Sequence, residues 1–175
     1  QPIGALGINR DITKRKLDEN ALQITNQQME MQLKEIGELQ AALHEQANRD
    51  SLTQLYNRRF LLDTLDREFI LAQRHSQFLS IVLLDIDHFK SINDSYGHEA
   101  GDIVLVEISK RLKTLLREDD LVARLGGDEF IVIVNNFENS SDIDKICNKL
   151  ISSVSMPIED SSRVYEVGIS IGIAT

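Results

Sequence analysis

The 175-residue sequence lacks several features that would place it in whole classes of proteins. A single cysteine, Cys147, excludes an intrachain disulfide framework and a zinc site built from cysteines, and it fits a reducing compartment. No apolar run approaches the roughly 20 residues that span a bilayer, and no signal peptide opens the chain. We therefore expect a cytoplasmic location and no direct membrane contact from this segment.

Basic residues are fewer than acidic ones. Lys and Arg total 19 against 28 Asp and Glu, which gives a formal net charge of −9. Because affinity for DNA or RNA depends on basic side chains that neutralise phosphates, the sequence argues against a nucleic-acid polymer as partner. Any phosphate chemistry is then expected to be local and to depend on a cation. Hydrophobic residues make up 42% and charged residues 27%, a balance typical of globular proteins.

Residues 1–15 are interpreted as the end of a domain. The run IGALGI at residues 3–8 predicts one strand, with residues 9–11 as its exit. Because one strand cannot bury itself, its partner strands are expected upstream.

Residues 16–48 predict a long helix, because Gly37 is their only glycine and they contain no proline. Four apolar residues in this segment fall seven apart, at Leu22, Met29, Ile36 and Leu43. A repeat of this period indicates a coiled coil, although Thr25 and Gln32 make the adjoining column partly polar. Two interpretations remain open here, a helix that associates with a second copy and a solvated connector.

Residues 49–175 predict one α+β domain, with a central, mostly antiparallel sheet flanked by helices. Strands are expected at residues 78–84 (buried on both faces), 121–125, 130–134 and 164–174, with an edge strand near Ile158. Helices are expected at residues 101–116 and 141–154, and two short ones between Ser51 and Leu65, joined near residues 56–58. The stretch Gly126-Gly127-Asp128-Glu129 is a tight hairpin signal between two of the strands.

Acidic residues follow two of the apolar strands. Asp85 and Asp87 end the first, and Asp128 and Glu129 occupy the hairpin. If the two strands are neighbours, their acidic ends converge, and close like charges require a cation. Oxygen-only ligands favour Mg²⁺ over zinc or copper. The alternative is that some of these acids are helix caps or solvated turn residues.

Two further features near these acids have two interpretations each. Gly126 and Gly127 supply the backbone angles of a hairpin, but they also let a phosphate approach backbone N–H groups closely. Lys90 can act as a point charge on a phosphate, or it can be a solvated helix lysine.

Three motifs together resemble one family. The stretches DSLTQLYNRR, DIDHFKSINDSYGHEAGD and RLGGDEF occur in this order and are similar to those of GGDEF diguanylate cyclases, over about residues 48–175. The earlier stretch GINRDITKRK resembles the end of a PAS sensor domain that runs into a signalling helix. The resemblance implies a nucleotidyl-cyclase-like domain with a ferredoxin-like core, preceded by a long N-terminal helix.

The resemblance also implies a reaction. Two GTP molecules condense into cyclic di-GMP with release of two pyrophosphates, each protomer of a homodimer holding one GTP. We expect the N-terminal helix to join the protomers, the upstream sensor to regulate activity, and Mg²⁺ or Mn²⁺ to serve as cofactor.

Site residues follow from the matched motif positions. The metal is expected on Asp85, Asp128 and the backbone carbonyl of Ile86, with Asp128 also the proposed base and Glu129 its acidic partner. The expected substrate-binding residues are Phe89, Lys90, Asn93, His98, Asp102, Gly126 and Gly127. Of these, Asn93 and Asp102 would read the guanine edge, which presents the opposite hydrogen-bonding pattern to adenine.

Arg117-Glu118-Asp119-Asp120 matches the R-x-x-D motif of the family's inhibitory site. Arg117 and Asp120 are therefore candidates for binding cyclic di-GMP as a feedback inhibitor, or else they are an ordinary helix end and turn. The family continues beyond the last strand into a helix with basic residues, so we expect the 49–175 domain to be C-terminally incomplete. The alternative function is a catalytically incomplete module that senses GTP or cyclic di-GMP.

Overall fold

The computed structural model describes residues 4–75, 77–117, 119–137, 139–160 and 163–175. Contacts divide the chain into two compact units, Gln1–Ala47 and Asn48–Thr175. Within the described residues, none of the helices combines the length and hydrophobicity needed to cross a bilayer.

The first unit is a single helix, α1 (Gly4–Ala47). The strand predicted at residues 3–8 is therefore wrong over residues 4–8, and Ile3 lies outside the described residues. The physical reason is that a lone strand leaves its backbone groups unpaired, whereas a helix pairs them within the same segment. The long helix predicted over residues 16–48 is confirmed.

The heptad residues of α1 face solvent within the single chain. Leu22, Met29, Ile36 and Leu43 are 52–61% exposed. Such a row of exposed apolar side chains is unfavourable in water unless a second surface covers it.

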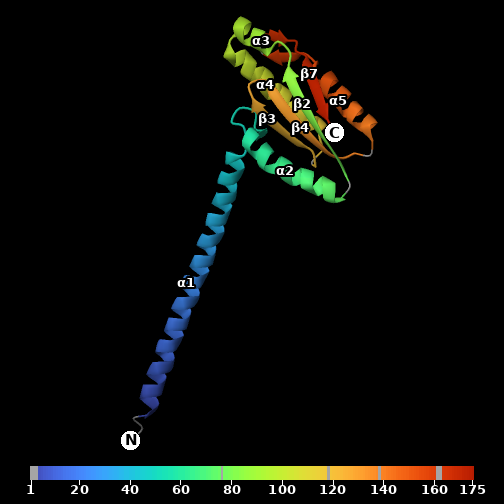
Figure 1. Cartoon of the computed structure of the whole chain (residues 1–175). Coiled ribbons are helices and arrows are strands. Elements are labelled where there is room, and N and C mark those ends of the chain that lie inside the picture. Colours follow the sequence, from blue (N-terminus) through green and yellow to red (C-terminus); the bar gives the residue numbers. More distant parts are fainter. Residues whose placement is uncertain (1–3, 76, 118, 138, 161–162) are drawn as a thin grey trace. The chain divides into compact units, whose positions relative to one another are not determined.

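The second unit contains a five-stranded sheet with the order β1-β3-β4-β2-β7 (Figure 1). Its strands are β1 (Tyr56–Asn57), β2 (Phe78–Ile86), β3 (Leu121–Gly126), β4 (Glu129–Phe137) and β7 (Ile169–Ala174). Only the β1–β3 pair is parallel, so the predicted mostly antiparallel α+β sheet is confirmed. The order β3-β4-β2-β7 is that of a ferredoxin-like βαββαβ unit.

Helices pack on both faces of this sheet. They are α2 (Arg58–His75), α3 (Phe89–Tyr96), α4 (His98–Leu115) and α5 (Ser140–Val154). The main core lies between the sheet and α4 and α5, where Val82, Phe130 and Leu105 are at most 2% exposed. A smaller cluster, Leu61, Ala123 and Ile133, packs α2 against the other face.

Three expectations about individual elements need correction. Strand β2 is buried on one face only, because alternate residues such as Leu83, 42% exposed, project to the less covered face. The segment before Tyr56 forms hydrogen-bonded turns rather than a first short helix, with Asp50 N–H donating to the Leu55 carbonyl at 2.8 Å. The last predicted strand is divided, because Gly168 separates β7 from a small hairpin of β5 (Ile158–Asp160) and β6 (Arg163–Tyr165).

The C-terminal end of α5 is held by a side chain from α4. Arg111 Nη1 donates to the Ser153 carbonyl at 3.0 Å, and Nη2 donates to the Pro157 carbonyl at 2.9 Å. Glu107 pairs with the same guanidinium at 3.1 Å. Because the last carbonyls of a helix have no partner within it, Arg111 satisfies groups that would otherwise need water.

Candidate active site

The acidic ends of β2 and β4 meet at one edge of the sheet. The antiparallel register places Asp85 opposite Glu129, and the Ile86 N–H donates to the Asp128 carbonyl at 3.3 Å. Asp128 is half-buried, whereas Asp85 and Glu129 are exposed. The convergence of the two acidic strand ends, predicted from the sequence, is therefore present.

The pKa of Asp85 is raised above the usual aspartate value. Partial burial is the largest cause, followed by the negative charges of Asp128 and Asp87. Negative charges that raise the pKa of a neighbouring carboxyl in this way are close enough to it to share a positive charge. Two carboxylates together with backbone carbonyls form an oxygen-only donor set that fits a divalent cation such as Mg²⁺. Among the described residues, no cluster brings together three or more His, Cys, Asp or Glu ligands, so any such site needs donors beyond side chains.

Asp87 has a different environment from Asp85. It follows the end of β2, its N–H donates to the Gly168 carbonyl at 3.0 Å, and its Oδ1 accepts a hydrogen bond from Ser170 Oγ at 2.6 Å. A Cβ on Gly168 would lie 2.7 Å from Asp87 Oδ2, so any other residue here would displace the Asp87 carboxylate. Asp87 thus fastens the end of β2 to the β7 segment.

The hairpin that carries Asp128 turns through two glycines. Gly126 and Gly127 have φ angles of +146° and +55°, which residues other than glycine rarely adopt. The guanidinium of Arg124 donates to the Gly127 carbonyl and pairs with Asp50. Sequence reasoning assigned no role to Asp50 or Arg124. Their only signal was that they lie inside the motifs DSLT and RLGGDEF.

Helices α3 and α4 bring other candidate residues together. A Cβ on Gly101 would lie 2.1 Å from Asn93 Oδ1, so the Asn93 side chain lies directly against Gly101, the residue before Asp102. Phe89 is buried, whereas Lys90, His98 and Asp102 are exposed. His88, between the acids and α3, has φ +57°, an uncommon angle that sequence reasoning did not foresee.

Arg117 and Asp120 are hydrogen-bonded to each other. The Arg117 N–H donates to Asp120 Oδ2 at 3.0 Å, and the Asp120 N–H donates to the Arg117 carbonyl at 3.1 Å. Both residues line a cavity of about 280 Å³ with Lys145 and Lys149. Glu118 lies outside the described residues.

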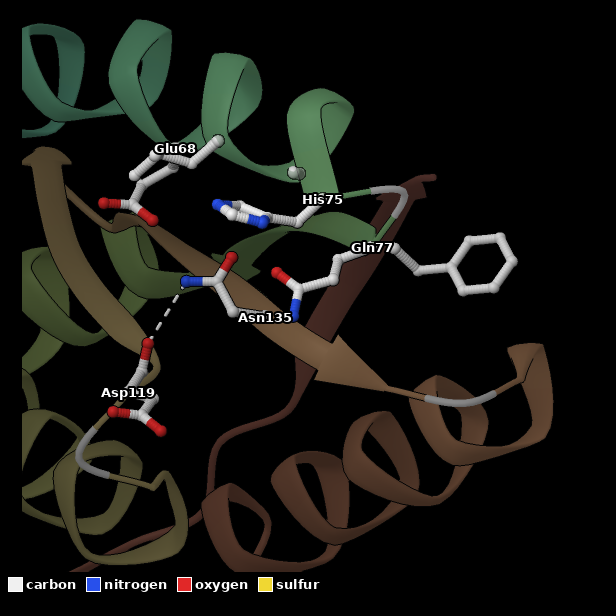
Figure 2. A pocket seen from close by; sticks show the side chains of 8 residues that line it. Glu68, His75, Gln77, Asp119 and Asn135 are labelled. Atoms are coloured by element: carbon white, nitrogen blue, oxygen red, sulfur yellow. Dashed lines mark hydrogen bonds between the residues drawn. The ribbon is translucent and has the colours of Figure 1, made fainter.

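A separate polar cavity of about 400 Å³ lies at the opposite end of the sheet from Asp85. Figure 2 shows Glu68 and His75 of α2 directed toward Asn135 of β4, whose amide donates to the Asp119 carbonyl at 3.2 Å. The ionisable residues that line this cavity are two acids, Glu68 and Asp119, and one histidine, His75. Such a set does not form a phosphate site, so the cavity is not a candidate for binding a nucleoside triphosphate.

Comparison with known proteins agrees with this geometry. Residues 47–175 match the family described as "Diguanylate cyclase, GGDEF domain". The diguanylate cyclase TpbB of Pseudomonas aeruginosa is 46% identical over 136 residues, which cover 77% of this chain and 31% of TpbB.

Two solved structures are similar over most of the chain. The diguanylate cyclase SiaD of Pseudomonas aeruginosa, solved with its activator SiaC, aligns with a TM-score of 0.73 and 33% identity over 97% of this chain and 65% of SiaD. The coiled coil and GGDEF domain of DgcB from Caulobacter crescentus, solved with cyclic di-GMP, aligns with a TM-score of 0.75 and 26% identity over 93% of this chain and 81% of that one. The chain spans a third or less of the length of the curated relatives named TpbB, MucR and DgcP.

Proposed function

The chain belongs to the GGDEF family of diguanylate cyclases, and from this premise we propose that it condenses two GTP molecules into cyclic di-GMP with release of two pyrophosphates. The observation that carries the proposal is the pairing of Asp85 with the hairpin acids across β2 and β4. Burial and then the negative charges of Asp128 and Asp87 raise the pKa of Asp85, and these neighbouring charges make the edge of the sheet a favourable place for a cation.

A divalent cation, Mg²⁺ or Mn²⁺, is proposed on the carboxylates of Asp85 and Asp128 and the backbone carbonyl of Ile86. When bound, it would neutralise the phosphates of GTP, which an acidic protein with a net charge of −9 cannot do by itself. The oxygen-only donors and the like-charge repulsion between the two acids support this assignment.

In the proposed reaction, the 3′-hydroxyl oxygen of each GTP attacks the α-phosphorus of the other. Two phosphorus–oxygen bonds form, two pyrophosphates leave, and each hydroxyl proton must be accepted by a base. Asp128 is proposed as that base, with Glu129 as its acidic neighbour. Gly126 and Gly127 would admit a phosphate beside the backbone, and Lys90 would hold the terminal phosphates.

Guanine selection is proposed for Asn93 and Asp102. An amide both donates and accepts, and a carboxylate accepts, which together suit the guanine edge. The contact of Asn93 with Gly101 supports this role, because Gly101 is the residue that precedes Asp102. His98 is proposed as a further substrate contact, and Phe89 as part of the pocket wall.

We propose that two protomers associate through α1, so that two GTP molecules face each other. The exposed row Leu22, Met29, Ile36 and Leu43 supports this, because a second copy of the helix would cover it. A sensor upstream of α1 is proposed to regulate this association or its geometry.

Product feedback is proposed at Arg117 and Asp120. The cavity that they share with Lys145 and Lys149 offers basic side chains for phosphates and the Asp120 carboxylate for guanine. A second carboxylate of the cavity, Asp142, pairs with Lys145 at 2.9 Å. Titration of cyclic di-GMP against the parent protein and an Arg117→Ala variant tests this proposal. Equal affinities would contradict it.

The main experiment incubates the protein with GTP and Mg²⁺ and measures cyclic di-GMP. We expect product from the parent protein and about a hundredfold less from Asp128→Ala, because the proposed base and one metal ligand are lost together. Equal rates would show that the assignment of Asp128 is wrong. If the parent binds GTP or cyclic di-GMP but forms no product, the non-catalytic sensor is the better description.

A further inference from the structure

The guanidinium of Arg124 contacts the GGDEF hairpin, which comprises residues 126–129, rather than solvent. Its Nε and Nη2 both donate to the Gly127 carbonyl, at 3.0 and 2.8 Å. Its Nη1 donates to Asp50 Oδ1 at 3.0 Å, and the Arg124 side chain is only 12% exposed. Hydrogen bonds from a charged donor at these distances are stronger than bonds between neutral groups.

Asp50 is itself fixed by the turn in which it lies. The same Oδ1 accepts hydrogen bonds from the Thr53 N–H at 2.9 Å and from Thr53 Oγ1 at 2.7 Å. The backbone of Asp50 is bonded at both groups, since its N–H donates to Leu55 and its carbonyl accepts from Gln54. Arg124 is therefore bonded to a rigid part of the chain.

The hairpin needs such a restraint from outside. Gly126 and Gly127 are exposed and have no side chains to limit their backbone angles, and the β3–β4 ladder is irregular between Arg124 and Gly126. The Ile86 N–H to Asp128 carbonyl bond is long, at 3.3 Å. The Gly127 carbonyl that Arg124 binds belongs to the peptide group leading into Asp128.

We propose that Arg124 and Asp50 are positioning residues for catalysis, which hold the hairpin in the shape that lets Asp128 and Asp85 act together. This role depends on the proposed function of Asp128. Because Asp50 lies three residues after Ala47, the last residue of α1, the pair also links the segment that follows the helix to the catalytic hairpin. A conformational change in that segment would then alter the position of Asp128 through the ion pair between Asp50 and Arg124.

The positioning role and a simple charge effect predict opposite results for Arg124→Gln. Removing a positive charge near Asp128 makes the site more negative, which by itself would strengthen cation binding. Loss of positioning would weaken it instead, because the two carboxylates would no longer be held in register for one ion. The sign of the change therefore separates the two explanations.

The test uses the whole protein and the variants Arg124→Gln, Arg124→Lys and Asp50→Asn. The first measurement is the Mg²⁺ concentration that gives half-maximal cyclic di-GMP formation. We expect it to rise roughly tenfold in Arg124→Gln and clearly in Arg124→Lys, which keeps the charge but not the fork of donors. Arg67→Gln, which removes an exposed arginine on α2, serves as the matched control and is expected to match the parent. An unchanged or lower Mg²⁺ requirement in Arg124→Gln would overturn the proposal.

The second measurement needs no nucleotide. Hydrogen exchange of the segment Leu84–Asp87 reports the bond from Ile86 to Asp128, and we expect it to quicken in Arg124→Gln and Asp50→Asn but not in Arg67→Gln. If Arg124→Gln does not fold, Arg124→Lys decides the outcome by both measurements. If these variants exchange faster than the parent but the parent makes no product, only the proposed function is contradicted. If the parent makes cyclic di-GMP but all three variants exchange at the parent's rate, only the positioning role is contradicted.

Discussion

The contact between Gly101 and Asn93 makes one methyl group a sensitive probe of substrate binding. A Cβ at position 101 would lie 2.1 Å from Asn93 Oδ1 and 3.1 Å from Phe89 Cζ, so Asn93 has to move in Gly101→Ala. We expect the KM for GTP to rise about tenfold while the fold persists, because the proposed guanine contact is displaced.

Gly172→Ala is the control for this variant. Its Cβ would meet nothing within 4 Å, so its kinetics should match those of the parent. The measurement is the initial rate of cyclic di-GMP formation against GTP concentration. An unchanged KM in Gly101→Ala would remove Asn93 from the substrate site.

The environment of Asp50 predicts how stability depends on pH. Burial alone would raise the pKa of Asp50, but hydrogen bonds from Thr53 and Arg124 and the charge of Arg124 outweigh it and lower the pKa below the ordinary 3.8. A carboxyl whose pKa is lowered on folding stabilises the fold above its ordinary value, and this contribution is lost as the pH falls through the folded pKa.

We therefore expect Asp50→Asn to melt below the parent at pH 7 and the difference to shrink as the pH falls below about 4. Asp63→Asn, at an exposed position on α2, serves as the control. Thermal melting across this pH range is the measurement. A difference that stays constant down to pH 2 would show that the charge of Asp50 does not stabilise the fold.

Individual site residues were predictable to different degrees. The convergence of Asp85 with the hairpin acids could be predicted, because acidic residues at the ends of two apolar strands meet when the strands are neighbours. Arg124 and Asp50 could not be predicted, because their contact joins residues far apart in the sequence and neither residue type is unusual where it stands. The hydrogen bond of Asp87 to Ser170 depends on the same kind of long-range register.

At the scale of elements, the end of α5 depends on one residue of α4. Arg111 donates to carbonyls at and beyond the last turn of α5 and is itself paired with Glu107. We expect Arg111→Met to lower the free energy of unfolding by about 2 kcal/mol, because several carbonyls lose a charged donor while the aliphatic packing is kept.

Lys110→Met is the matched control, since it removes a neighbouring charge from the same helix at a 69% exposed side chain. Urea denaturation of both variants is the measurement, and we expect the control to lie within about 0.5 kcal/mol of the parent. Equal stability of the two variants would show that Arg111 does not hold the end of α5.

Elements with a strong periodic pattern were predicted well, and elements without one were not. The apolar run of β2 and the helical spacing in α4 are determined by burial, which the sequence records directly. The run IGALGI has the composition of a strand, but strand formation needs partner strands, and the residues from Gly4 are helical instead. The division of the last predicted strand into β6 and β7 depends on which partners each part finds, and composition does not record that.

At the scale of the whole molecule, association through α1 is the central prediction. We expect Ile36→Asp to raise the dissociation constant of the dimer at least about tenfold, because it places a charge in the apolar row of the coiled coil. Met31→Asp introduces the same charge at a 69% exposed residue outside that row and is expected to leave association unchanged.

Sedimentation equilibrium over a range of concentrations is the measurement for both variants. A parent protein that remains monomeric at the highest concentration would contradict the prediction. So would equal weakening of the dimer by both substitutions, because the row would then have no special part in the contact.

The ladder of eight residue pairs between β2 and β4 also limits where insertions and deletions can be tolerated in β2. One added or deleted residue between Leu79 and Asp85 would slide Asp85 past Glu129 and turn inward side chains outward. The only irregular step of that ladder falls between Phe78 and Leu79, at the end remote from the acids. We expect indels to survive selection at that remote end and to be eliminated along the rest of the strand.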